Sequence, residues 1–189
     1  MNLPNKLTLI RLCMVPVFLV LLCVNFGIPD TVLRIVTAVI FALTSLTDML
    51  DGKIARKYNL ISDYGKLMDP LADKILVYSA FCLMVPEYVP SWMLIIILAR
   101  EFLVAGVRTV AASEGIVIAA ALSGKIKTVL QMFAVPLLLL LPVTEQFTDL
   151  SFLHGINYIA AMALLWGSLI MTIYSGAEYA IKNKEVFKQ

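Results

Sequence analysis

Long apolar runs separated by short charged connections dominate this sequence and restrict the folds open to it. The 189-residue chain is 61% hydrophobic and 15% charged, with a mean hydropathy of +0.92, which is typical of integral membrane proteins. A helix needs about 20 mostly apolar residues to cross a bilayer. We therefore predict one all-α membrane domain over residues 1–189, with six transmembrane helices near residues 7–26, 30–58, 69–85, 90–112, 124–141 and 153–182.

Lysine and arginine residues gather at alternate connections between these helices. They surround the second and fourth connections and both chain termini, whereas the first, third and fifth connections hold almost none. Positive side chains are enriched in cytoplasmic connections of membrane proteins. This pattern predicts a multi-pass protein of the cell membrane whose two termini and even-numbered connections lie in the cytoplasm.

Four aspartates fall close together in this otherwise apolar chain: Asp48, Asp51, Asp69 and Asp73. A carboxylate at the centre of a membrane helix costs about 3 kcal/mol, so four of them need a compensating partner. Spacings of three and four residues put each pair on one face of a helix. Carboxylate oxygens suit Mg²⁺ or Mn²⁺, and two such ions stabilise both oxygens of a phosphoryl displacement. The four aspartates therefore predict a two-metal site at the cytoplasmic end.

Two neighbours of the aspartates fit a phosphate-bearing ligand. Gly52 removes a side chain beside Asp51 and costs about 1 kcal/mol within a helix, so its presence needs a reason. Arg56 lies one turn further on, where its guanidinium can bind a phosphate in a bidentate manner. The alternative is a solvated loop with helix caps, in which Asp69 is an N-cap and Pro70 the first helical residue. That alternative leaves the other three aspartates unexplained.

The pattern D-x2-D-G-x2-A-R-x8-G-x3-D-x3-D, which begins at Asp48, resembles the signature of the CDP-alcohol phosphatidyltransferase family. The resemblance implies that Asp48, Asp51 and Asp69 bind two divalent cations, with Asp73 at the second cation and acting as general base. It implies further that a CDP-linked lipid donor is bound by residues near the nucleotide: Asn5, Thr8, Gly52, Arg56 and Ser62. Asn5 and Thr8 belong to an N-terminal amphipathic segment in that family, for which the alternative is a plain interfacial anchor.

The acceptor alcohol must be recognised outside the shared signature. Four cations are predicted near the cytoplasmic end of the bundle and would suit a phosphorylated acceptor: Arg100, Arg108, Lys125 and Lys127. Lys125 and Lys127 open the fifth predicted helix, where the helix N-terminus adds positive potential for an anion. The alternatives are a structural Arg100–Glu101 pair between helices and lysines that serve topology alone.

The stretches around Arg100 and Lys125 resemble the bacterial members of the family that use glycerol 3-phosphate. The resemblance implies transfer of a phosphatidyl group from CDP-diacylglycerol to glycerol 3-phosphate with release of CMP, within a homodimer. Two alternatives stay open: the same fold with inositol phosphate or phosphatidylglycerol as acceptor, and a divalent-cation transporter. A transporter would be expected to carry acidic residues near the middle of the bilayer and internally related halves, neither of which the sequence shows.

Overall fold

A computed structural model describes residues 3–24, 26–57, 63–113, 121–147 and 151–183, and for residues 3–8, 48–57 and 63–70 it describes the backbone alone. Within these ranges every regular element is an α-helix. The helices are α1 (Leu3–Cys23), α2 (Asp30–Lys57), α3 (Asp63–Leu83), α4 (Ser91–Ser113), α5 (Leu122–Leu139), α6 (Leu141–Gln146) and α7 (Ser151–Lys182). Each of the six predicted runs corresponds to one long helix, and the short α6 is additional.

The fifth predicted run ends as two helices rather than one. Leu140 separates α5 from α6, and Pro142 lies in the first turn of α6. Proline is tolerated there because the first backbone N–H groups of a helix have no intrahelical partner. Proline within a helix is also seen at Pro16 in α1 and at Pro136 in α5.

The beginning of α3 differs from the prediction. The helix starts at Asp63, so Asp69 and Pro70 lie inside it. The interpretation of Asp69 as an N-cap is therefore wrong. Aspartate is favoured at helix N-termini, and Asp63 is the first residue of α3.

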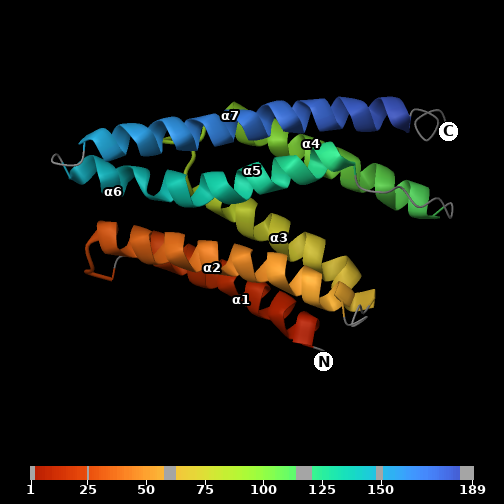
Figure 1. Cartoon of the computed structure of the whole chain (residues 1–189), viewed down its shortest axis with the longest axis horizontal. Coiled ribbons are helices and arrows are strands. Elements are labelled where there is room, and N and C mark those ends of the chain that lie inside the picture. Colours follow the sequence, from red (N-terminus) through yellow and green to blue (C-terminus); the bar gives the residue numbers. More distant parts are fainter. Residues whose placement is uncertain (1–2, 25, 58–62, 114–120, 148–150, 184–189) are drawn as a thin grey trace.

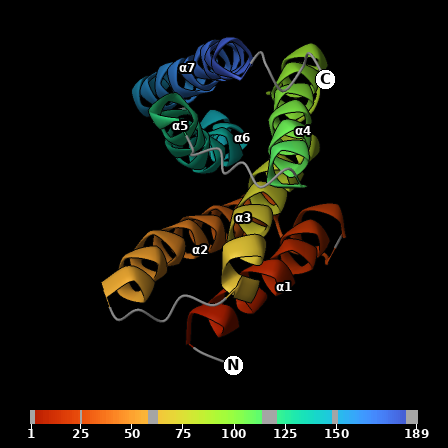
Figure 2. The same cartoon turned by 90° about the vertical axis from the view of Figure 1, so that its right-hand side faces the viewer.

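The helices form two groups that lie across one another (Figure 1). Helix α1 packs against α2 and α3, and α5 pairs along its length with α7, which also contacts α4 and α6. Helix α2 packs on α5 and joins the groups, and Figure 2 shows α3 running from the lower group up to α4. At the right-hand end of Figure 1, α2 and α4 end and α3 and α5 begin, as the predicted alternation requires.

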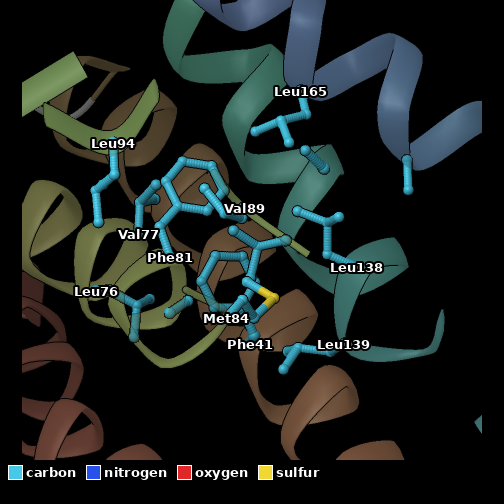
Figure 3. Close-up of a cluster of buried hydrophobic side chains, with 14 of the residues drawn as sticks. Phe41, Leu76, Val77, Phe81, Met84, Val89, Leu94, Leu138, Leu139 and Leu165 are labelled. Carbon is cyan, nitrogen blue, oxygen red and sulfur yellow. The ribbon is translucent and has the colours of Figure 1, made fainter. Parts of the chain in front are cut away.

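A continuous apolar core holds the two groups together. Phe41 from α2, Phe81 from α3 and Leu138 from α5 are fully buried and meet with Leu165 of α7 (Figure 3). The outward-facing residues are also apolar: Phe102 is 73% exposed and Ile159 is 69% exposed. A bundle that is apolar inside and outside is suited to lipid. Among the described helices, three are long and apolar enough to cross a membrane, namely Asp30–Thr47, Leu122–Gln146 and Ser151–Lys182.

Candidate active site

The backbone places the four aspartates on two helices that follow one another in the chain. Asp48 and Asp51 lie in the last third of α2, and Asp69 and Asp73 lie on α3. Asp69 lies in the second turn of α3, and Asp73 lies at the midpoint of that helix. The structure describes only the backbone of residues 48–57 and 63–70. These ranges include Asp48, Asp51, Asp69 and Arg56, so the two-metal site stays a prediction.

The donor-binding residues of the prediction are described only in part. Ser62 lies outside the described residues. Asn5 and Thr8 are in the first turns of α1, with their side chains outside the description. The N-terminal segment is thus part of α1 itself and not a separate helix. Arg11 follows on the same helix and is buried.

Asp73 is half-buried. The next residue, Lys74, forms an ion pair with Glu101. The Nζ atom of Lys74 lies 3.2 Å from Oε2 of Glu101 on α4. Lysine and glutamate therefore connect the helix of the predicted base to α4. Of the four aspartates, Asp73 is the one whose side chain the structure describes.

Glu101 is the centre of a cluster of cations from three helices. It is only 6% exposed, and it accepts hydrogen bonds from Arg100 Nη1 at 2.5 Å and from Lys127 Nζ on α5. Lys127 is itself 2% exposed. Buried charges are tolerated when paired and hydrogen-bonded, and here the carboxylate has a cation from each of α3, α4 and α5.

The structure brings together two of the four residues predicted to bind the acceptor. Arg100 and Lys127 share the carboxylate of Glu101. Arg108 lies two turns further along α4, with its guanidinium 5.8 Å from the ring centroid of Tyr179 on α7. Lys125 is exposed on the first turn of α5. The Arg100–Glu101 pair does exist, but within one helix. The contacts between helices come from Lys127 on α5 and Lys74 on α3.

Arg100 passes close to a glycine on α7, Gly176, and near another on α5, Gly124. A Cβ atom on Gly176 would lie 3.1 Å from Arg100 Cγ, and one on Gly124 would lie 3.6 Å from Arg100 Nη2. Gly124 belongs to the first turn of α5, so Arg100 reaches the end of that helix even though it lies midway along α4. Nearby, Glu178 of α7 accepts a hydrogen bond of 2.6 Å from Ser123. This bond connects the beginning of α5 to the end of α7.

Three residues at this end of the bundle were given no role in substrate binding by the sequence-based prediction. Glu101 is an acidic residue inside an apolar run, and a charge in such a position indicates a functional or paired residue. Lys74 is one of the cations around the second predicted connection, a position that by itself indicates topology alone. Tyr179 carries a hydroxyl that is buried and has no hydrogen-bond partner among the described residues, and its sequence position gave no indication of this.

The apolar exterior and the charged group at one end define a helical membrane protein with a polar site. The family model for CDP-alcohol phosphatidyltransferases matches residues 1–174. The chain belongs to the CDP-alcohol phosphatidyltransferase family. Members of this family are generally dependent on divalent cations.

Relatives with an assigned activity match almost the whole chain. A protein of Bacillus subtilis strain 168 is 41% identical, over 99% of this chain and 97% of its own length. A protein of Rickettsia typhi is 37% identical over 98% and 99%, and one of Salmonella paratyphi A is 33% identical over 89% and 91%. All three are named CDP-diacylglycerol–glycerol-3-phosphate 3-phosphatidyltransferase.

Proposed function

We propose that this protein transfers a phosphatidyl group from CDP-diacylglycerol to a hydroxyl of glycerol 3-phosphate, with release of CMP. The observation that carries the proposal is the near full-length similarity to three relatives named for this activity. The convergence of Arg100 and Lys127 on the carboxylate of Glu101 supports it, because a phosphorylated acceptor needs cations that are already in place.

The aspartates would hold the metal ions. Asp48, Asp51, Asp69 and Asp73 offer carboxylates alone, a donor set that fits Mg²⁺ or Mn²⁺. Their positions on two consecutive helices support a shared site. Two ions bound there would stabilise the attacking and leaving oxygens. Asp73 takes the proton from the acceptor hydroxyl, and this loss of the proton makes the oxygen a better nucleophile toward the donor phosphorus.

The remaining predicted residues bind the two substrates. Gly52 lets the nucleotide approach α2, and Arg56 binds a donor phosphate, with Ser62, Asn5 and Thr8 nearby in the family pattern. Arg100, Lys127, Arg108 and Lys125 would receive the acceptor phosphate. The acyl chains enter sideways from the bilayer, since the outer faces of the helices are apolar.

The protein is proposed to be one domain over residues 1–189 that crosses the cell membrane six times. The shared end of α2, α3, α4 and α5 would face the cytoplasm, where both substrates' polar groups are. The positive charge of the even-numbered connections supports this orientation. A homodimer is proposed on the family resemblance.

The test is to supply purified protein in detergent with CDP-diacylglycerol, Mg²⁺ or Mn²⁺, and one acceptor at a time, and to measure CMP. We expect CMP release to depend on glycerol 3-phosphate. Release that depends instead on inositol phosphate or phosphatidylglycerol would reassign the acceptor. No CMP release with any of the acceptors would contradict the proposed reaction.

A further inference from the structure

Glu101 lies among residues proposed to bind the acceptor, yet it carries the same sign of charge as the acceptor phosphate. A carboxylate would repel a phosphate that came directly to it. Its role must therefore lie in what it does to the surrounding cations. Resting on the proposed function, we propose that Glu101 is a positioning residue that holds Lys127 and Arg100 where the acceptor phosphate binds and, through Lys74, fixes them relative to Asp73.

The burial of Lys127 supports this role. At 2% exposure its ammonium group is separated from bulk water, and it donates to Glu101 Oε1. A buried ammonium needs a fixed counter-ion when no substrate is bound. Glu101 supplies that counter-ion on the neighbouring helix, so Lys127 stays charged and in place before the acceptor arrives.

The charge balance leaves room for one phosphate. Lys74, Arg100 and Lys127 contribute three positive charges and Glu101 one negative charge, which leaves a net charge of +2. A phosphate monoester carries about −1.5 to −2 at neutral pH. The positive charge of the four residues thus matches the negative charge of one phosphate group. The Glu101 carboxylate also limits repulsion among the three cations.

The two contacts of the Glu101 carboxylate would set the distance between the cations that bind the acceptor phosphate and the base that acts on its hydroxyl. Glycerol 3-phosphate has its phosphate at one end and its reacting hydroxyl at the other, so the distance between cations and base must be fixed. Glu101 contacts Lys127 on α5 through Oε1 and Lys74 on α3 through Oε2. Lys74 follows Asp73 directly in the chain. Fixing reacting groups in this way removes orientational freedom from the reaction.

The test compares Glu101→Gln and Glu101→Asp with Glu178→Gln as a matched control. Glu178 also lies at this end, pairs with Lys182 at 2.5 Å and accepts from Ser123, but it contacts none of the three cations. The measurements are kcat, the KM for glycerol 3-phosphate, the KM for CDP-diacylglycerol, and inhibition by inorganic phosphate. Each variant's thermal unfolding in detergent is recorded in parallel.

For Glu101→Gln we expect the KM for glycerol 3-phosphate to rise about tenfold or more and inhibition by phosphate to weaken, with the KM for CDP-diacylglycerol within about twofold of wild type. Glu101→Asp should recover part of the loss because it restores the charge. Glu178→Gln should leave both KM values unchanged. If Glu101→Gln does not fold, Glu101→Asp is the test, with a smaller selective rise.

Two results would overturn the inference. One is a Glu101 variant with lower stability or kcat but unchanged KM for glycerol 3-phosphate, which indicates a structural ion pair. The other is an equal rise in both KM values. These outcomes are distinct from failure of the proposed function, because in that case the wild-type protein itself would release no CMP with glycerol 3-phosphate.

Discussion

Lys127 of α5 donates a hydrogen bond to Glu101 of α4, and both side chains are withdrawn from solvent, at 2% and 7% exposure. Lys74 of α3 contacts the other oxygen of the same carboxylate but is 39% exposed. Two lysines therefore share one partner in different surroundings. The contribution of an ion pair depends strongly on burial, so exchanging each lysine should have a different effect on stability.

Lys127→Met should lower the free energy of unfolding by about 1.5–3 kcal/mol, the range for a lost hydrogen bond to a charged group, since Glu101 keeps Arg100 and Lys74 as partners. Lys74→Met should cost about 1 kcal/mol or less, because Lys74 is partly solvated. Unfolding in detergent micelles, followed by circular dichroism, measures both. Equal losses for the two variants would contradict the burial argument.

A double variant provides the control for this comparison. Lys127→Met with Glu101→Gln removes both members of the buried pair, so neither is left without the other. Arg100 and Lys74 lose their carboxylate in Glu101→Gln alone as well, so the comparison isolates the Lys127–Glu101 interaction. We expect the double variant to be more stable than the sum of the single losses implies, with a coupling of about 1–3 kcal/mol. Additive losses would mean that the pair contributes little.

The sequence predicted the helices well because hydrophobic run length is a direct consequence of bilayer thickness. It failed at α6 and at the start of α3. The break at Leu140 comes just before Pro142, which has no N–H to continue the hydrogen bonding of α5. The run of apolar residues continues through the break, so a search for such runs does not detect it. At Asp63 the helix extends into polar residues, which a search for apolar runs leaves out.

The sequence predicts site residues where a function requires a particular residue type. It predicts less where a contact depends on how the helices pack. Four aspartates in an apolar chain required an explanation from sequence alone. The convergence of Arg100 and Lys127 on Glu101 depends on α4 extending beyond the beginning of α5 (Figure 1), which spacing along the chain does not contain. Tyr179 became notable only when its hydroxyl was found buried.

Tyr179→Phe should leave stability unchanged or raise it by about 1 kcal/mol. The hydroxyl is buried with no hydrogen-bond partner among the described residues, so its removal relieves a desolvation cost. The ring that lies beneath Arg108 is kept. Tyr179→Leu, which loses that ring, should be less stable than Tyr179→Phe in the same thermal unfolding assay. A large loss of stability in Tyr179→Phe would show that the hydroxyl has a partner.

Gly176→Ala should displace Arg100 and raise the KM for glycerol 3-phosphate by about threefold. The added Cβ would lie 3.1 Å from Arg100 Cγ, closer than ordinary contact. Gly155→Ala on the same helix is the matched control, since its Cβ would meet no atom within 4 Å and alanine favours the helix by about 1 kcal/mol. Similar KM values in both variants would argue against crowding at Arg100.

Removal of divalent cations should abolish CMP release. Without them, four carboxylates and the donor phosphates would repel one another at one end of the bundle. The measurement is activity after chelation, followed by separate titrations with Mg²⁺ and Mn²⁺. Recovery with either ion is expected, and full activity in excess chelator would contradict the two-metal proposal.

Asp73→Asn should lower kcat by about 10²- to 10⁴-fold, the range expected when a general base is lost. The asparagine oxygen still offers a ligand and the other three carboxylates remain, so metal binding should be retained substantially, as measured by Mn²⁺ titration with electron paramagnetic resonance. Asp30→Asn is the control for the same exchange: Asp30 pairs with Arg34 at 2.6 Å at the opposite end of α2, and its variant should keep normal turnover. Normal turnover in Asp73→Asn would refute its assignment as the base, whereas loss of Mn²⁺ binding would make it chiefly a metal ligand.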